Sequence, residues 1–558
     1  MKWNVKAPRT SDNLFDDFIK SRNITDFARF TSDKISDLHN PYDIPHMGEA
    51  VEKILSYVST KKKIYVYGDF DVDGTAATAT LWGYLHELEA NVWPFIPNRV
   101  DEGYGMSEKT LRHLKDDGAE LVISVDCGIR DIELTEFAKG IGLDLIITDH
   151  HEFVKDEKGN PVLPKTIIVH SKHPDGDYDT ILSGGATAWK LICAIEEKLT
   201  GEPYTERTLE YIQFAALTTI TDVMPLVNEN RTIVKIGIKK LRTTNSIGLR
   251  KMYELSNIDP RLLEVYHLGF VIGPRLNAPG RVENSAMDSL RLLCTNKESQ
   301  AIELAQKLED LNHKRQDWTV KYMELAKEQT IEQLKLKNKI ILIKGEDWPE
   351  GIVGLVAGKI AEKFSRPTLV ATENSHEKKI TGSARSIIGL NIVDLISKAA
   401  EHLSRYGGHR AAAGFALKPE NFEKFKASLL ENANKEISDD QLEPLLNIDM
   451  EAKCSDLTLD FVNQIETLAP YGNGNLTPLF TLNNLKVIDV RKLGKNGEHL
   501  KLKVSGDSSK PFDAIAFNFY KAEVFTGDII DLAFTPKKNE WNGNISVQLE
   551  FKDIRKAD

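Results

Sequence analysis

Three aspartates stand at alternate positions where a buried strand should end. The stretch IYVYGDFDVDGTAATAT covers residues 64–80 and contains Asp69, Asp71 and Asp73, with Gly74 directly after. Alternate residues of an extended strand share one face, so the three carboxylates would lie close together and repel one another. A bound cation would offset that repulsion, and the pattern therefore indicates a metal site.

Further candidate ligands follow two other apolar runs. The run LVISVD ends in Asp126, and the run DLIITD ends in Asp149, which His150 and His151 follow directly. Asp222 interrupts the apolar pattern of AALTTITDVMPL. Imidazole and carboxylate together suit manganese, zinc or iron. Two cations that share a carboxylate can use this many ligands, and such two-metal centres catalyse phosphoryl displacement.

Other interpretations of these residues are weaker. The string D-x-D-x-D-G resembles the start of a calcium loop, but DFDVDGTAATAT has no acidic residue at the twelfth position, and a predicted strand precedes it. A single His-His pair is more often incidental than a metal site. Three strand ends that each offer aspartate, one with His-His attached, favour two-metal chemistry over a structural explanation.

The elements that must position these groups form an α/β domain. Predicted strands at 64–69, 121–126 and 144–149 alternate with predicted helices at 75–90 and 131–139. This alternation indicates a mainly parallel sheet. Ligands of such sheets collect at the carboxyl ends of the strands, which is where the aspartates fall.

The rest of the chain predicts a long helix, a second α/β unit and a β-rich tail. A charged segment without Gly or Pro, 298–336, indicates a connecting helix. The next unit has predicted strands at 339–344, 368–372 and 379–384 and predicted helices at 352–364 and 391–404. Beyond 435, alternating apolar and polar runs indicate a small barrel or sandwich, and we expect an OB-like domain there. The expected domains are 1–55 (an N-terminal extension), 56–295, 296–337 (the connecting helix), 338–434 and 435–558.

Composition limits the class of protein only broadly. The chain has 558 residues, of which 41% are hydrophobic, and its four cysteines form no CxxC pair. With no signal-peptide run and no apolar run of about 20 residues, we expect a cytoplasmic protein without a membrane span. The net charge of −11 argues weakly against nucleic-acid binding. The stretches 231–251 and 486–503 are basic, but each is interpreted first as a solvated face.

Several stretches resemble a known superfamily. In order, GDFDVDGTAAT, SVDCG, TDHHE and TDVMPL resemble the four motifs of the DHH phosphoesterases, and YGGHRAAAGFAL resembles the GGH motif of the accompanying DHHA1 domain. The stretches PNRVDEGYG, LSGGATAWK, IGPRLNAPGRV, LNHKRQ and GSARS are similar to the branch that degrades single-stranded DNA. The resemblance covers the chain from about residue 60 onwards, and is looser in the β-rich tail.

The resemblance implies a site with two Mn²⁺ ions, with Mg²⁺ as an alternative. The implied metal ligands are Asp69, Asp71, Asp73, Asp126, His150 and Asp222. Asp126 would bridge the ions, and Asp69 would bind or support the first ion, where Tyr67 replaces a histidine of many relatives. His151 would face the scissile phosphate, and Asp149 would orient a histidine.

The resemblance also implies a path for a nucleic-acid strand. Arg99, Ser383 and Arg385 would hold a 5′-phosphate, while Arg275, Asn277 and Arg281 would follow the backbone. Tyr104 would stack on a base, and His409 and Arg410 lie in the GGH motif, where small residues allow close approach. For each arginine, a surface ion pair is the alternative.

The implied function is a metal-dependent 5′→3′ exonuclease that degrades single-stranded DNA to 5′-mononucleotides in DNA repair and recombination. The implied partners are single-stranded DNA, a single-strand-binding protein and a RecQ-type helicase. The alternative is a DHH phosphodiesterase of short oligonucleotides or cyclic dinucleotides. The β-rich tail and the long helix favour a polymeric substrate, and the full set of acidic groups argues against a non-catalytic scaffold.

Overall fold

The computed structural model describes residues 1–98, 105–506, 510–519, 523–541 and 543–557. Arg99 and Tyr104, both predicted to contact substrate, lie outside the described residues. The chain forms two compact units. One contains Asp33–Glu443, and the other combines Met1–Ser32 with Pro444–Asp558.

A five-stranded parallel sheet forms the centre of the first α/β domain. Its order is β3-β2-β4-β5-β8. The strands are β2 (Ile64–Gly68), β3 (Val92–Phe95), β4 (Leu121–Val125), β5 (Asp144–Thr148) and β8 (Ile167–Val169). The predicted parallel sheet is thus confirmed, while β3 and β8 were missed. The strands are nearly continuous apolar runs because helices cover both faces of the sheet.

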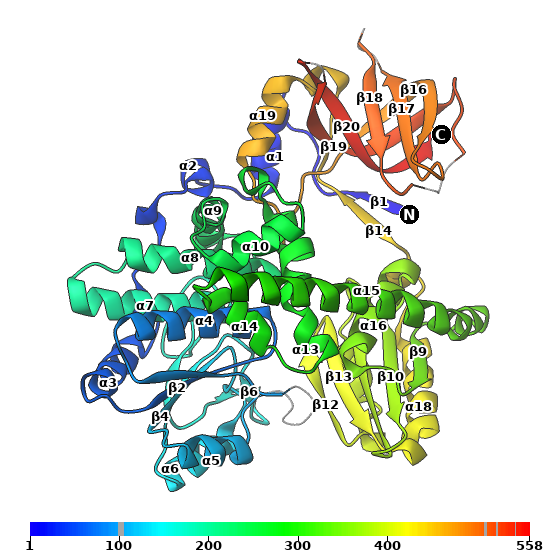
Figure 1. Cartoon of the computed structure of the whole chain (residues 1–558). Coiled ribbons are helices and arrows are strands. Elements are labelled where there is room, and N and C mark those ends of the chain that lie inside the picture. The colour runs from blue at the N-terminus through cyan, green and yellow to red at the C-terminus, as the bar shows by residue number, and fades with distance from the viewer. Residues whose placement is uncertain (99–104, 507–509, 520–522, 542, 558) are drawn as a thin grey trace. The chain divides into compact units, whose positions relative to one another are not determined.

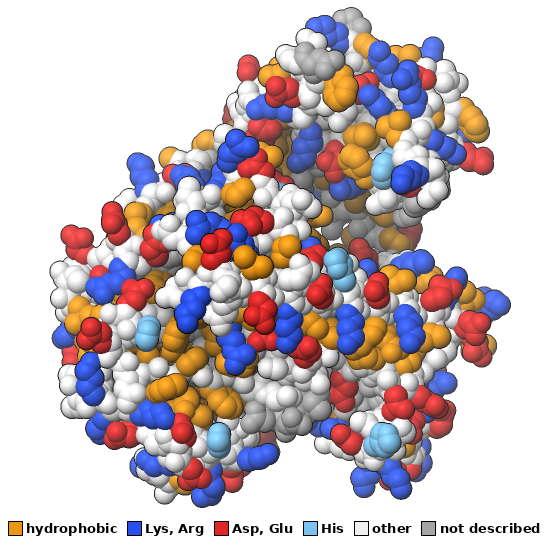
Figure 2. Space-filling view, viewed as in Figure 1, with side chains coloured by type: hydrophobic (Ala, Val, Ile, Leu, Met, Phe, Trp, Pro, Cys, Tyr) orange, Lys and Arg blue, Asp and Glu red, His pale blue; other side chains and the backbone are white. Residues whose placement is uncertain are grey.

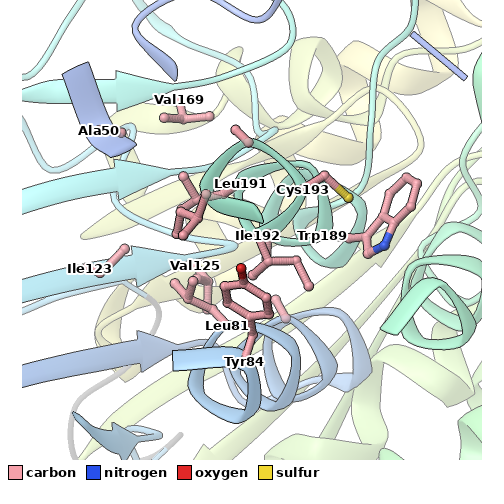
Figure 3. Close-up of a cluster of buried hydrophobic side chains, with 14 of the residues drawn as sticks. Ala50, Leu81, Tyr84, Ile123, Val125, Val169, Trp189, Leu191, Ile192 and Cys193 are labelled. Atoms are coloured by element: carbon pink, nitrogen blue, oxygen red, sulfur yellow. The ribbon is translucent and has the colours of Figure 1, made fainter. Parts of the chain in front are cut away.

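Helices cover the two faces unequally (Figure 1). One face packs against α3 (Met47–Ser59), α4 (Val72–Glu87), α7 (Gly184–Thr200) and α8 (Glu206–Thr221), and the other against α5 (Glu108–Asp116) and α6 (Ile132–Gly140). In the core of the first face, Leu81 and Tyr84 of α4 meet Ile192 of α7 beside Val125 (Figure 3). This packing fixes the starts of α4 and α7 at the carboxyl edge of the sheet.

A long helix leads to the second α/β domain. The predicted connecting helix is α15 (Glu298–Lys335), and the sheet that follows has the order β12-β13-β11-β10-β9. Its strands are β9 (Ile341–Glu346), β10 (Thr368–Asn374), β11 (Lys379–Arg385), β12 (Arg405–His409) and β13 (Ala412–Leu417), and α16 (Glu350–Phe364) packs on β10 and β11.

One predicted helix of this domain is wrong in its second half. The prediction covered 391–404, but α17 is Ile392–Ser397 and only a short 3₁₀ turn, Ala400–His402, follows it. The backbone N–H of Ser404 already donates to the carbonyl of Ala416 at 2.8 Å. Pairing with the neighbouring strand therefore overrides the helical pattern.

The second unit is a closed β-barrel with the N-terminus attached. Its strands are β16 (Phe480–Leu493), β17 (His499–Ser505), β18 (Phe512–Ala516), β19 (Ile529–Trp541) and β20 (Asn544–Lys556), and pairing of β16 with β19 closes the barrel. This confirms the predicted OB-like domain. The strand β1 (Lys2–Val5) pairs in parallel with β14 (Leu445–Ile448). The N-terminal segment predicted as 1–55 is therefore divided between the two units.

Several basic side chains of the stretch 231–251 form ion pairs or are buried. Lys239 pairs with Asp33, Lys240 pairs with Glu210, and Arg231 is buried. Figure 2 likewise shows acidic and basic side chains interspersed over the visible face. These contacts agree with the interpretation of this stretch as an ordinary helix face. Among the described residues, no helix is both long and apolar enough to cross a membrane.

Candidate active site

The acidic groups meet at the carboxyl edge of the first sheet. Asp69 follows β2, Asp126 follows β4 and Asp149 follows β5. Asp126 has a left-handed backbone with φ 63°, and its N–H donates to the carbonyl of Thr148 at 3.0 Å. This turn out of the strand directs the Asp126 carboxylate across the edge toward the neighbouring aspartates.

The predicted metal ligands fall into three overlapping groups. Within each group, the candidate ligand atoms lie within 4.8 Å of one another. The groups are Asp69 with Asp71 and Asp126; Asp73 with His150 and Asp222; and Asp126 with Asp149, His150 and His151. Asp126 belongs to two groups, as a bridging ligand would. The structure thus brings together every residue predicted at the metal centre.

The helix starts orient two of these carboxylates. Asp71 caps α4 by accepting a hydrogen bond from the N–H of Gly74 at 3.1 Å. The two oxygens of Asp73 accept from the N–H groups of Gly184 and Gly185, at 2.8 and 2.7 Å. A Cβ at Gly184 would lie 2.5 Å from the Cβ of Asp126, so only glycine fits there. The start of α7, which the sequence did not single out for this role, therefore shapes the centre.

Asp149 acts through its neighbours. Its side chain is fully buried and accepts hydrogen bonds from the N–H of Ile129 at 2.9 Å, from the N–H of His150 at 2.7 Å and from Nδ1 of His151 at 2.7 Å. Burial acts to raise its pKa, but the charge of His151 and these hydrogen bonds hold the pKa of Asp149 below its usual range. The hydrogen bond to Nδ1 of His151 is the contact that an orienting residue needs, and the orienting role itself stays a prediction.

The two adjacent histidines differ in charge. Burial and the neighbouring His151 lower the pKa of His150 to about 3. For His151, burial acts to lower the pKa, but Asp149 outweighs it and raises the pKa to about 9. His150 is therefore a neutral imidazole at neutral pH, which is the form that binds metals, and His151 is a cation.

The centre fits a divalent cation. Oδ1 of Asp126 and Nε2 of His150 lie 3.0 Å apart, are buried, and find no hydrogen-bond partner in the described part of the chain. Burial and the charge of Asp71 also raise the pKa of Asp73 to about 7. A cation between these groups would satisfy the lone pairs and remove the repulsion.

Tyr67 has another role at the position where many relatives have histidine. Its hydroxyl donates to the carbonyl of Gly105 at 3.0 Å, and its ring stacks on Phe95 with centroids 5.3 Å apart. The group formed by Asp69, Asp71 and Asp126 therefore offers oxygen ligands alone.

A cleft of about 660 Å³ lies between the two α/β domains beside the acidic edge. The first domain contributes Asp149, His151, Arg130 and Asp131, and the second contributes Glu350, Lys379, Arg405, Tyr406 and His409, among others. The rings of His151 and His409 lie 6.0 Å apart and are nearly parallel. His409 thus lies in the cleft beside the acidic edge, and its role in strand binding stays a prediction.

The sequence analysis missed seven polar residues of this cleft: Arg130, Asp131, Glu350, Lys379, Thr381, Arg405 and Tyr406. Two signals could have revealed two of them. Arg130 follows Asp126 by four positions, and Arg405 directly precedes the YGGH stretch. These residues come close to one another only because the two α/β domains, which are separate in the sequence, pack together.

The other residues predicted to bind substrate lie in different parts of the structure. Nη1 of Arg385 donates to Oγ of Ser383 at 2.8 Å, and both side chains lie against Gly354 of α16. Asn277 accepts from the N–H of Val72 at 3.1 Å and so supports the acidic loop. Arg275 pairs with Glu309, Arg281 donates to the carbonyl of Gly351 at 3.2 Å, and Arg410 lines a separate cavity.

The order of domains and the acidic edge define a class of phosphoesterase. Residues 63–219 match the N-terminal domain of the DHH family, residues 337–435 match the DHHA1 domain, and residues 448–553 match the RecJ OB domain. The third match, to the RecJ OB domain, narrows the class from DHH phosphoesterases in general to the RecJ proteins.

Relatives agree with this assignment. The chain is 35% identical over 528 residues to the single-stranded-DNA-specific exonuclease RecJ of Bacillus subtilis (strain 168), covering 94% of this chain and 65% of that protein. It is 32% identical to RecJ of Thermus thermophilus, covering 89% of this chain and 69% of that protein. Crystal structures of Thermus thermophilus RecJ with Mn²⁺ and with Mg²⁺ match at TM-scores of 0.83 and 0.78, both at 26% identity, covering 100% of this chain and 80% and 79% of those chains. The chain belongs to the RecJ family.

Proposed function

We propose that this chain hydrolyses single-stranded DNA from the 5′ end and releases 5′-mononucleotides. The observation that carries the proposal is the cleft in which His151, beside the acidic edge, faces the basic residues of the second α/β domain. The family supports it, because its members are named for single-stranded-DNA-specific exonuclease activity.

The acidic edge would hold two Mn²⁺ ions, with Mg²⁺ as an alternative. The proposed ligands are Asp69, Asp71, Asp73, Asp126, His150 and Asp222, with Asp126 as the bridge. Bound there, the cations supply Lewis-acid activation of water and offset charge on the phosphate. The nitrogen of His150 favours Mn²⁺, because Mg²⁺ prefers oxygen ligands.

His151 would stabilise charge on the scissile phosphate. With a pKa of about 9, its imidazole is protonated at neutral pH and presents a cation to the cleft. Asp149 holds that ring by the 2.7 Å hydrogen bond to Nδ1. A fixed donor aimed at developing negative charge contributes strongly to catalysis in a partly dry site.

The second α/β domain would bind the strand. Its Lys379 and Arg405, together with Arg130 of the first domain, bring positive charge to the cleft, and its Tyr406, which is 40% exposed, offers a ring for base stacking. Ser383 and Arg385 remain the proposed pocket for the 5′-phosphate, which a guanidinium can bind through two hydrogen bonds. A cytoplasmic location, a single-strand-binding protein and a RecQ-type helicase as partners belong to the same proposal.

Degradation of single-stranded DNA labelled at its 3′ end tests the activity. With Mn²⁺, we expect release of mononucleotides and progressive shortening of the labelled strand, with a matched duplex and a matched RNA as comparison substrates. Activity confined to the last few nucleotides, or none on long strands, would instead indicate a phosphodiesterase of short oligonucleotides or cyclic dinucleotides.

Replacement of Arg385 tests the polarity. Arg385→Ala should slow degradation of 5′-phosphorylated strands more than that of 5′-hydroxyl strands, by about 10-fold, because a charge-assisted hydrogen bond to phosphate is lost. Arg410→Ala is the matched control: Arg410 lines a different cavity, so both ends should be affected equally. An equal effect of Arg385→Ala on the two ends would remove Arg385 from the end pocket.

A further inference from the structure

A second group of side chains of the types that bind metals lies outside the cleft. His46 directly precedes α3, and His173 and Asp175 lie in the segment that follows β8. One ligand atom from each of the three residues lies within 4.8 Å of the other two. Neither the proposed nuclease chemistry nor the sequence analysis uses these residues.

The distances in this group suit a small tetrahedral cation. Nε2 of His46 lies 3.1 Å from Oδ2 of Asp175, and Nδ1 of His173 lies 3.7 Å from the same oxygen. Zinc with bond lengths of about 2.0–2.2 Å to nitrogen and oxygen places neighbouring ligand atoms about 3.3–3.5 Å apart in a tetrahedron. The two observed separations bracket that range, so small side-chain shifts would complete the geometry.

A further carboxylate supports one of the histidines. Nδ1 of His46 lies 3.2 Å from Oε1 of Glu49, one turn into α3. A histidine that binds metal commonly donates its other ring N–H to a carboxylate, which fixes the tautomer and increases the basicity of the ligating nitrogen. With Nδ1 directed at Glu49, Nε2 of His46 faces Oδ2 of Asp175, and an ion between them would replace that contact.

Packing of the two segments against each other also brings these side chains together. His46 has a left-handed conformation, with φ 61°, which is uncommon for a residue other than glycine. A Cβ at Gly176 would lie 2.5 Å from Cγ of Pro45, so the segments are in direct contact. His173 is buried, with 4% exposure, and its ring meets that of His46 at 75°. The donors are therefore pre-positioned.

We propose that His46, His173 and Asp175 form a zinc site that fastens the segment after β8 to the start of α3. Asp175 is largely exposed, which leaves the fourth position open to water. In the present arrangement Nδ1 of His173 accepts a hydrogen bond from the N–H of Asp175 at 3.2 Å, and the ion would replace this bond. Two imidazoles with one carboxylate favour zinc over magnesium or calcium.

Calorimetric titration of metal-free protein with Zn²⁺ tests the proposal. His46→Ala and His173→Ala should each bind one ion fewer than the wild type, whereas His113→Ala, a change of an exposed histidine on α5, should bind the same number. Asp126→Ala should retain this ion, which separates the site from the catalytic edge. Glu49→Gln should weaken the affinity of this ion about 10–100-fold without removing it.

Thermal unfolding in the Asp126→Ala background gives an independent readout. Zinc should raise the melting temperature, and this rise should disappear when His46→Ala is added. Metal-free circular dichroism identifies a variant that fails to fold, in which case Asp175→Asn, a change of an exposed ligand, replaces it. Equal zinc stoichiometry in the wild type, His46→Ala, His173→Ala and Asp175→Asn would overturn the proposal.

Discussion

Adjacent histidines at the active site take opposite protonation states. The pKa of His150 is lowered to about 3, and that of His151 is raised to about 9. The difference arises because Nδ1 of His151 donates to the buried carboxylate of Asp149, which raises the pKa of His151, whereas burial and the charge of His151 lower the pKa of His150. Asp149 thus keeps His151 positively charged, while His150 stays neutral and can bind metal.

Asp149→Asn tests this assignment. The substitution removes the charge that keeps His151 protonated and disturbs four hydrogen bonds, so we expect kcat on single-stranded DNA to fall about 10–100-fold. Asp156→Asn is the control, because Asp156 lies in an exposed turn and accepts from the N–H groups of Lys158 and Asn160. If kcat stays at the wild-type value in Asp149→Asn, the orienting role is wrong.

The start of α7 is the element that completes the metal centre. Its first two N–H groups hold Asp73, 111 and 112 positions earlier in the chain, and Gly184 allows Asp126 to approach. Helix N-termini stabilise negative charge through unpaired N–H groups and the helix dipole. The element therefore offsets part of the repulsion among the carboxylates and also orients them.

Gly184→Ala should damage catalysis more than folding. The added Cβ would lie 2.5 Å from Cβ and 2.6 Å from Oδ1 of Asp126 and would displace that carboxylate. We expect nuclease activity to fall by about 100-fold or more, because displacements near 1 Å already cost about that much. The control is Gly140→Ala at the end of α6, where a Cβ meets no atom within 4 Å. Wild-type activity in Gly184→Ala would contradict the close approach.

Local patterns in the sequence predicted the elements, but not all of the contacts between them. The apolar runs that end in Asp69, Asp126 and Asp149 were sufficient to place the acidic edge, because strand ends of a parallel sheet meet. The role of Gly184 and the approach of Arg405 to the acidic edge of the other domain could not be predicted in this way. Both depend on how separate segments pack in space, which residue spacing does not encode.

At the scale of the whole molecule, the two ends of the chain fold together. Met1–Ser32 and Pro444–Asp558 form one unit, although more than 400 residues separate them. Two partly buried ion pairs join them, Arg9 with Asp456 and Arg22 with Asp449. The sequence analysis assigned the N-terminal segment as a separate extension because pairing across this separation leaves no local signal.

Arg22→Ala should destabilise this unit. Arg22 donates two hydrogen bonds to Asp449 and a third to the carbonyl of Leu476. Its loss leaves a nearly buried carboxylate without its cation, so we expect the free energy of unfolding to fall by about 2–3 kcal/mol. Denaturant titration measures the change, with Lys20→Ala as control, an exposed position on α1 (Leu14–Ser21), the helix that Arg22 follows directly. A midpoint unchanged by Arg22→Ala would show that the ion pair does not stabilise the unit.

The central claim is that the carboxylates and histidines at the sheet edge hydrolyse single-stranded DNA with bound metal. Single-turnover cleavage of 5′-phosphorylated single-stranded DNA in Mn²⁺, compared between the wild type and Asp126→Ala, tests it most directly. Asp126 is shared by two of the ligand groups, so we expect its loss to reduce the rate at least about 100-fold. A rate in Asp126→Ala close to that of the wild type would contradict the claim.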